Sequence, residues 1–222
     1  MKQPIITDID KLSNRCEEFD VRKQGVVARG TIIDLKDTLR ELTGFHGISA
    51  PLIDTNLRII VMNYSGDMKS YCNPIITGTD GFSLSREKCA ALPGREFLAP
   101  RYTKISIAYQ TPMGKLESCE LVGLSAQIFQ HEIDHLEGLL LSDFALEIDE
   151  SYDKATEDER AELIKFYLDQ LQVKYTEVEK EIAEDKELKE LNDGIKFVQA
   201  VSRGEVTLAP YNKKTDKVEL VN

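Results

Sequence analysis

The chain has 222 residues, 41% of them hydrophobic, which is enough for one domain with a packed core plus an appended segment. Its formal net charge of −11 argues against binding to nucleic acid or to anionic membranes through bulk electrostatics. The sequence holds no apolar run of about 18 residues and begins without a secretory signal, so we expect a cytoplasmic protein that does not span a membrane. In that reducing environment the four scattered cysteines are expected to be free thiols or metal ligands.

The N-terminal part of the chain divides into a polar stretch and a helical pattern. Residues 1–30 are mixed in character, with Gly25 and Gly30 as breakers, and we expect them to be rich in loops. Apolar side chains then recur at mostly helical spacing over residues 32–42. Gly44 is placed to end this predicted helix.

The segments that follow are typical of antiparallel strands. Leu57–Met62 predicts a buried strand, which residues 65–67 close as a turn. Apolar and polar residues alternate over 105–109, so a half-buried strand is expected there, followed by a hairpin turn at residues 111–114 that leads into residues 115–121. Strands that precede a late helix, without regular alternation of strand and helix, indicate the α+β class.

The composition changes after about Asp149. We therefore predict a first domain of residues 1–149 and a mostly helical C-terminal extension of residues 150–222. Thr156 and Glu159 have the spacing of a capping box. Apolar side chains then follow a heptad spacing within residues 157–183, at Ile164, Leu168, Leu171, Tyr175, Val178 and Ile182. A long helix packed on its own domain and a helical hairpin or self-association surface both account for this pattern. The last residues, 206–220, are expected to form a short strand or a tail.

A helical pattern begins near Gly123 and contains the motif His131-Glu132-Ile133-Asp134-His135. The sequence has only three histidines, and two that lie four residues apart on a helix share one face, about 6 Å apart, which suits a single metal ion. Glu132 is then placed to act as a general base on a water molecule. Leu124 and Ile128 share the histidine face, so we expect that face to be buried. A solvated polar helix surface is the competing interpretation.

The motif alone leaves the third metal ligand open. Peptidases that use HExxH usually place it downstream, where Glu157 and Glu159 are candidates. The alternative lies upstream, at Cys89, for which an inert buried thiol is the competing interpretation. We prefer the inert interpretation for the other cysteines, which are Cys16, Cys72 and Cys119.

Several further segments surround this motif in a definite order. They are Asn73-Pro74-Ile75, Glu87-x-Cys89 with Pro93-Gly94, Pro100-Arg101, the strand at 105–109 and Gln130-His131-Glu132-x-Asp134-His135-Leu136-x-Gly138. Together they resemble the peptide deformylases in order and spacing. The resemblance covers about residues 30–145 and leaves the C-terminal region outside it.

The resemblance implies β-sheets wrapped around the HExxH helix and a metal site formed by Cys89, His131 and His135. One divalent ion would bind there, with Fe(II) as the usual native metal of the family and Zn or Ni as alternatives. The implied reaction removes the N-formyl group from the N-terminal methionine of nascent peptides, with Glu132 as the proton-transfer group. The implied partner is a formyl-methionyl peptide, and an association with the ribosome that produces it is a further expectation.

The sequence departs from the family on the substrate side. The first family motif reads Gly-x-Gly-Leu-Ala-Ala-Pro-Gln, where this chain has Phe45-His46-Gly47-Ile48-Ser49-Ala50-Pro51-Leu52. The glycine at Gly47 is kept, and it belongs to the expected substrate and oxyanion site. Leu52 replaces the glutamine, whose amide normally donates to the formyl oxygen. Loss of one oxyanion donor costs about 2.7–4 kcal/mol, or 100- to 1000-fold in rate.

The second family motif is also altered, from Glu-Gly-Cys-Leu-Ser to Glu87-Lys88-Cys89-Ala90-Ala91. The backbone N–H of Ala90 needs no particular side chain, so it still serves as an expected oxyanion donor. Lys88 replaces a glycine and would strain the loop if the backbone has a positive φ there. His46 is either a replacement donor or an ordinary surface or packed histidine, and Arg101 is either a substrate contact or part of a structural ion pair.

Three functional interpretations follow from these residues. The first is a metal-dependent amidohydrolase of the deformylase type, with an activity reduced by Leu52. The second is a catalytically weak or inactive deformylase-like protein that binds a peptide or a partner. The third is an HExxH metallopeptidase with a downstream glutamate ligand, which requires Cys89 to be dispensable for metal binding.

Overall fold

The computed structural model describes residues 1–64, 66–184, 207–208 and 220–221. By its backbone contacts the chain separates into two units, Met1–Ala155 and Thr156–Asn222. The division into domains of residues 1–149 and 150–222 stays a prediction. None of the helices in the described ranges is both long and apolar enough to cross a bilayer.

Two antiparallel sheets form the frame of the first unit. The larger sheet has the strand order β1-β2-β3-β6-β7, and the smaller has the order β4-β5-β8. The bounds are β1 Gly47–Ser49, β2 Ile59–Tyr64, β3 Asp67–Asp80, β4 Ser83–Glu87, β5 Glu96–Arg101, β6 Lys104–Gln110, β7 Leu116–Val122 and β8 Leu146–Ile148. All neighbouring strands run antiparallel. The predicted α+β class is therefore confirmed.

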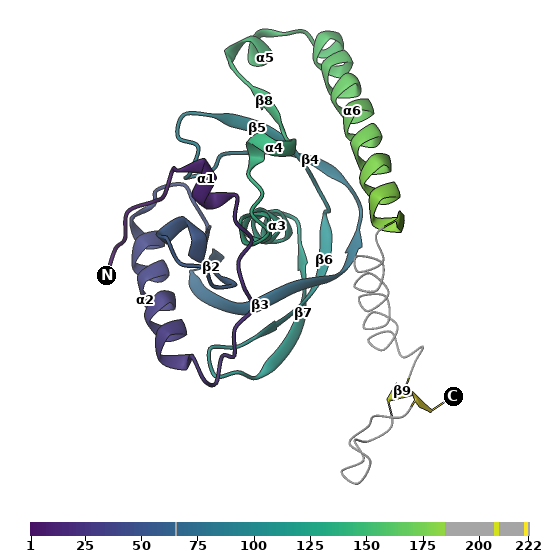
Figure 1. Cartoon of the computed structure of the whole chain (residues 1–222). Helices are drawn as coiled ribbons and strands as arrows, with labels where there is room; N and C mark the ends of the chain where they lie inside the picture. The colour runs from purple at the N-terminus through teal and green to yellow at the C-terminus, as the bar shows by residue number, and fades with distance from the viewer. Residues whose placement is uncertain (65, 185–206, 209–219, 222) are drawn as a thin grey trace. The chain divides into compact units, whose positions relative to one another are not determined.

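One helix of the first unit lies among the strands and the others lie around them. The helical segments of this unit are α1 Ile9–Leu12, α2 Gly25–Glu41, the 3-10 helix η1 Ala50–Ile53, α3 Leu124–Leu136, α4 Leu141–Phe144 and α5 Glu150–Lys154. Figure 1 shows α3 almost end-on, surrounded by strands of both sheets, and α3 packs against β1, β2 and β7. The expectation of β-sheets around a central HExxH helix is confirmed.

The sequence around α3 explains where this helix begins and ends. Gly123 precedes the helix with φ +61° and ψ −130°, a conformation that favours glycine. Phe129 and Leu136 are fully buried, which fixes the helix against the larger sheet. Beyond the helix, Gly138 has φ +77°, and a Cβ there would lie 2.6 Å from the Ser13 backbone oxygen. The predicted C-terminal glycine is thus also the point where the N-terminal segment crosses the end of α3.

Strand β2 contributes to both halves of the core, because successive side chains of a strand point to opposite faces. Ile59 and Val61 pack in the cluster that also contains the buried side chains of α2. Ile60 and Met62 pack in the second cluster, with the apolar side chains of α3. A strand covered on both faces has an unbroken apolar run, here residues 59–62, which is why the sequence predicted a buried strand in this segment.

The expectation that residues 1–30 are mostly loop is wrong in part. Helix α1 lies within them, and α2 already begins at Gly25 rather than near residue 32. Gly30 sits inside α2 with open space around the position of a side chain. Burial of Ala28 and the apolar residues after it outweighs the low helix propensity of the two glycines. The predicted strand at 105–109 and the hairpin after it are confirmed by β6 and β7.

In the second unit, α6 spans Glu157–Glu184, and short strands β9 Thr207–Leu208 and β10 Leu220–Val221 pair with each other. The capping box is confirmed, because the backbone N–H of Glu159 donates to the Thr156 hydroxyl and the Thr156 N–H donates to the Glu159 carboxylate. Ile164 and Leu168 of the heptad seam are half-buried. The seam members from Leu171 onward lie outside the described side chains, as does most of 206–220, so self-association through residues 157–183 stays a prediction.

Candidate metal centre

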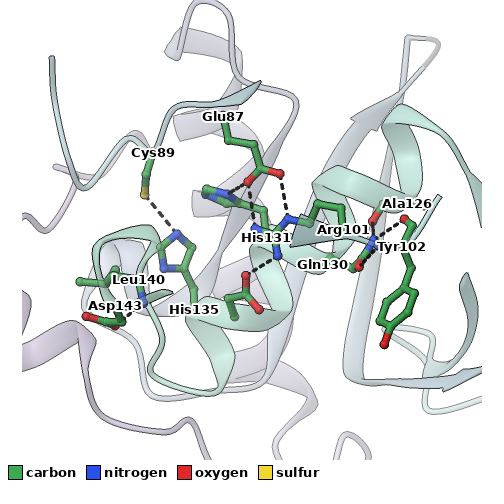
Figure 2. Close-up of polar contacts among 11 residues, drawn as sticks. Glu87, Cys89, Arg101, Tyr102, Ala126, Gln130, His131, His135, Leu140 and Asp143 are labelled. Atoms are coloured by element: carbon green, nitrogen blue, oxygen red, sulfur yellow. Dashed lines mark hydrogen bonds and ion pairs between the residues drawn. The ribbon is translucent and has the colours of Figure 1, made fainter. Parts of the chain in front are cut away.

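Three potential ligands converge beside α3. The ligand atoms of Cys89, His131 and His135 all lie within 4.8 Å of one another. The two histidines are one helical turn apart, with ring centroids separated by 5.0 Å. Cys89 follows β4 and reaches across to α3, where its Sγ lies 3.2 Å from Nε2 of His135 (Figure 2). The structure thus brings together the three residues that the sequence predicts as metal ligands.

A buried carboxylate orients the first histidine. Nδ1 of His131 lies 2.9 Å from Oε2 of Glu87, which leaves Nε2 of His131 for the metal side. Metal-binding histidines are commonly oriented in this way by a carboxylate on the other ring nitrogen. Sequence reasoning assigned no role to Glu87. Its place two residues before Cys89 was the available signal, because alternate residues at the end of a strand point to the same side.

Arg101 holds this carboxylate in place (Figure 2). Its Nε and Nη2 donate to the two oxygens of Glu87 at 2.8 and 2.9 Å, and its Nη1 donates to Asp134 at 2.7 Å. The Arg101 side chain is only 3% exposed. The structure therefore places Arg101 in the structural ion pair that was one of its two interpretations.

The charges around the centre shift several pKa values. Burial alone would raise the pKa of Glu87, but the hydrogen bonds from Arg101 and His131 outweigh it and lower that pKa to about 2. Burial, together with the charges of His131 and Arg101, lowers the pKa of His135 well below its usual range. Burial would lower the pKa of His131, but its hydrogen bonds to Cys89 and Glu87 raise that pKa well above its usual range. Of the two ligand imidazoles, His135 is therefore the one held in the neutral form that metal binding needs.

Glu132 lies beside the ligands with one oxygen unsatisfied. The residue is 4% exposed, and its Oε2 has no hydrogen-bond partner among the described residues. Burial raises the pKa of its carboxyl, while the nearby His131 opposes this shift. A Cβ on Gly47 would lie 2.8 Å from Oε1 of Glu132, so the close approach of this carboxylate requires glycine at that position.

These residues fit a divalent transition metal. A thiolate and two imidazoles form a soft-to-borderline donor set that suits Fe(II), Zn or Ni. Three protein ligands leave a coordination position free, which is the arrangement of catalytic rather than structural sites. Glu132, next to His131 in the sequence, has a buried Oε2 without a hydrogen-bond partner among the described residues, an acceptor that a water on the metal would satisfy. The donor set and its surroundings therefore agree with a single metal ion.

An open cavity of about 150 Å³ leads to the centre. Gly47, Ile128 and Glu132 are among the residues that line it, and so is Leu124, which is 51% exposed. The expectation that this whole helix face is buried was wrong at Leu124, because the face borders the cavity rather than the core. His46 is exposed and also lines the cavity.

The substrate-side residues fall into different environments. Leu52 is 2% exposed and packs in the apolar cluster that includes Cys89, so the glutamine position now belongs to the core. Lys88 lines the cavity without backbone strain, since Asp54 and Asn73 are the only non-glycine residues in the described ranges with positive φ. The strain considered for Lys88 is therefore absent.

The downstream glutamates and the other cysteines do not belong to this group of ligands. The Glu159 carboxylate, one of the downstream candidates, accepts hydrogen bonds from the backbone and side chain of Thr156. Cys16 and Cys72 are buried, and burial raises the pKa of each thiol to about 11. Cys119 is partly exposed on β7. Among the described residues, only the group around Cys89 has the geometry of a metal site.

Comparisons with known proteins agree with this architecture. The polypeptide deformylase family model matches residues 3–150. The chain is 35% identical over 135 residues to a peptide deformylase of Dictyoglomus turgidum, covering 61% of this chain and 84% of that protein. It is 27% identical to the solved peptide deformylase of Thermotoga maritima, with a TM-score of 0.60 and coverage of 64% and 97%. A class I type b peptide deformylase from Acinetobacter baumannii shares the fold at 22% identity, with a TM-score of 0.61 over 64% of this chain and 99% of that one. The chain therefore belongs to the peptide deformylase family.

Proposed function

We propose that this chain hydrolyses the N-formyl group from the N-terminal methionine of peptides. One observation carries the proposal: the ligand atoms of Cys89, His131 and His135 lie within 4.8 Å of one another, beside the unsatisfied Oε2 of Glu132. An open cavity reaches this group, so a peptide end has access to it. Family membership supports a deformylase-like hydrolase, and the geometry supports the assignment of these four residues.

Cys89, His131 and His135 would hold the metal ion, and we propose Fe(II) as the native metal, with Zn or Ni as functional substitutes. When bound, such an ion supplies Lewis-acid activation of water and of the formyl carbonyl. Glu87 keeps His131 in the ring orientation that presents Nε2, and Arg101 keeps Glu87 ionised. The ligands are thereby held ready before the metal binds, which favours a well-defined coordination geometry.

Glu132 moves the proton during the reaction. Its carboxylate takes a proton from the attacking water as the new C–O bond forms at the formyl carbon. The C–N bond then breaks, formate leaves, and Glu132 returns the proton to the departing amine. The backbone N–H of Ala90 is the proposed donor to the tetrahedral oxyanion. In the described part of the chain this N–H binds no acceptor, so it is available for that contact.

A reduced rate is part of the proposal. The side chain at position 52 is an apolar leucine that packs in the core, so the family's side-chain donor to the oxyanion is missing. The same observation favours a second candidate function, in which the cavity binds a formylated peptide end without turning it over. The two candidates differ in product and not in binding site.

Two associations belong to the proposal as well. Formyl-methionyl peptides arise at the ribosome, so the proposed substrate brings the chain to nascent peptides there. Self-association through α6 is supported by the heptad spacing, which includes Ile164 and Leu168. Sedimentation of the full chain and of an Ile164→Glu/Leu168→Glu variant tests it, and identical masses for both would reject the α6 interface.

Product analysis tests the reaction type. Metal-loaded protein is incubated with formyl-Met-Ala-Ser and with the same peptide carrying an acetyl group, and products are identified by mass spectrometry. We expect the free amine and formate from the formylated peptide, with the peptide bonds intact. An unchanged formyl peptide that nevertheless binds would favour the second candidate. Cleaved peptide bonds, together with metal retention in Cys89→Ala, would indicate a metallopeptidase instead.

A further inference from the structure

The side chain of Glu132 rests against one face of β1. A Cβ on Gly47 would lie 2.8 Å from Oε1 and 3.0 Å from Cγ of Glu132. Ser49 is two residues further along the same strand, and residues i and i+2 of a strand share a face. The next side chain on the face that Glu132 contacts is therefore the hydroxymethyl group of Ser49.

The Ser49 hydroxyl has no partner that explains its burial. The residue is 0% exposed, and its Oγ makes no hydrogen bond within the described part of the chain. Ser49 is also the N-cap residue of η1, a position where a serine side chain usually binds the first turn, yet no such bond is present. A buried hydroxyl left unsatisfied is destabilising, so a serine here needs another reason.

Glu132 provides the complementary atom. Its Oε2 is a buried acceptor without a hydrogen-bond partner, and the Ser49 hydroxyl is a buried donor that also has none. Burial raises the pKa of the Glu132 carboxyl, and the nearby Ser49 hydroxyl acts in the opposite direction by favouring the ionised form. A hydroxyl hydrogen rotates freely about the C–O bond, so a small adjustment of either side chain satisfies both atoms.

The position is also a departure from the family motif, which has alanine where this chain has Ser49. Ser49 lies three residues before Leu52, and at Leu52 the change is the opposite one, from a polar to an apolar side chain. The chain has thus lost one side-chain donor from this segment and gained another, which points toward Glu132.

We propose that Ser49 is a positioning residue whose hydroxyl donates a hydrogen bond to the Glu132 carboxylate and holds it in the orientation for proton transfer. The inference rests on the proposed function, because Glu132 needs a fixed orientation only if it moves a proton. A hydrogen bond to a charged group contributes roughly tenfold or more to an equilibrium or rate that depends on it. The effect belongs in kcat, since Ser49 touches Glu132 and not the bound peptide.

Steady-state kinetics with formyl-Met-Ala-Ser form the first test. Ser49→Ala restores the family residue and so is compatible with the fold, and it is compared with Ser70→Ala. Ser70 is the matched control because its hydroxyl is likewise buried and unpartnered, but it lies on β3, two strands away from β1. We expect kcat to fall roughly tenfold in Ser49→Ala, with KM and metal content unchanged, and no change in kcat in Ser70→Ala.

A double-mutant cycle provides a second measurement that needs no turnover. Urea unfolding is measured for the Ni(II)-loaded wild type, Ser49→Ala, Glu132→Ala and the double variant, with equal metal content verified. We expect the two substitutions to be coupled, by roughly a tenfold change in the unfolding equilibrium constant. Ser70→Ala in place of Ser49→Ala should give no coupling with Glu132→Ala.

The outcomes separate this inference from the function on which it rests. Absence of coupling overturns the Ser49–Glu132 contact whether or not the protein is active. Coupling with an unchanged kcat in Ser49→Ala overturns the positioning role. If the wild type releases no more formate than Glu132→Ala, the proposed function fails, while the cycle alone still decides whether the contact exists.

Discussion

At the scale of single residues, His131 depends on a chain of buried charges. Glu87 fixes the His131 ring, and Arg101 binds Glu87 through two hydrogen bonds. Both members of this ion pair are largely removed from water, with side-chain exposures of 3% and 10%. Removing one partner of a buried ion pair leaves an uncompensated charge, so the arrangement affects both stability and metal binding.

We therefore predict that Arg101→Met destabilises the protein by about 3–5 kcal/mol and weakens metal binding by roughly 10- to 100-fold. Urea unfolding and chelator competition measure the two effects. Arg95→Met is the matched control, because Arg95 also binds a carboxylate, Glu147, through two hydrogen bonds, but with 37% and 50% exposure. Its loss should cost less than about 1 kcal/mol and leave metal binding unchanged. Equal effects of the two substitutions would contradict the role of Arg101.

A second residue-scale prediction concerns position 52. Leu52→Gln returns the family's side-chain donor, and we expect kcat/KM for the formylated peptide to rise, with about 100- to 1000-fold as the upper range. Steady-state kinetics measure this, and Leu52→Met serves as an apolar control of similar volume. An unchanged rate in Leu52→Gln would show that other substrate-side differences limit activity.

Much of the candidate site was predictable from spacing. His131 and His135 share a helix face at any register of the helix, and Glu132 is adjacent to them in sequence. The resemblance then singled out Cys89. For Glu87 the only signal was its place two residues before Cys89, and the sequence carried no signal for the proposed role of Ser49, because each role depends on a partner that a different strand or helix brings close. Sequence spacing describes one element at a time, whereas these contacts are set by packing between elements.

At the scale of elements, α2 shows how packing overrides local propensity. Its first turn includes Gly25, and Gly30 lies in its interior, which is why the sequence pattern placed the helix start too late. Strand β3 similarly continues through Asn73, whose φ is +45° and whose side chain is bound by Phe19 and Gln110. In both elements the unfavourable residue is held by contacts that are distant in sequence.

We expect Gly30→Ala to stabilise the protein by about 0.5–1 kcal/mol, because the added methyl group meets no atom within 4 Å beyond its chain neighbours and the backbone of its own helix, and because alanine restricts the unfolded chain. Urea unfolding measures the change. Gly138→Ala is the contrasting substitution, since φ is +77° and the new Cβ would meet the Ser13 backbone at 2.6 Å. Stabilisation by both substitutions would contradict the assigned backbone geometry.

At the scale of the whole molecule, the fold class followed from the sequence because strand patterns precede the late helix pattern, without regular alternation of strand and helix. The arrangement of two sheets around α3 followed from the resemblance and not from the pattern. Burial in the core also makes the stability of the protein depend on pH, which the amino-acid composition does not reveal. Cys72 on β3 is fully buried in the core, and burial raises the pKa of its thiol from 9.0 to about 11.

The folded state therefore keeps the Cys72 proton where the unfolded chain loses it. The contribution of this thiol to the free energy of unfolding is fully present below pH 9. It decreases by on the order of 2–3 kcal/mol as the pH rises to about 11. Urea unfolding between pH 8 and pH 11 measures the loss, and Cys72→Ala should show a smaller alkaline decrease than the wild type. Parallel curves for the two proteins would contradict this assignment.

The most direct test of the account is the initial rate of formate release from formyl-Met-Ala-Ser by the metal-loaded protein. The rate is compared between the wild type and Glu132→Ala at equal metal content. The structure places Glu132 beside a three-ligand centre with an unsatisfied carboxylate oxygen. We predict that the wild type releases formate at least 100-fold faster than the variant, within the usual range for loss of a general base. Equal rates for the two proteins would contradict the assignment of this centre as a hydrolytic site.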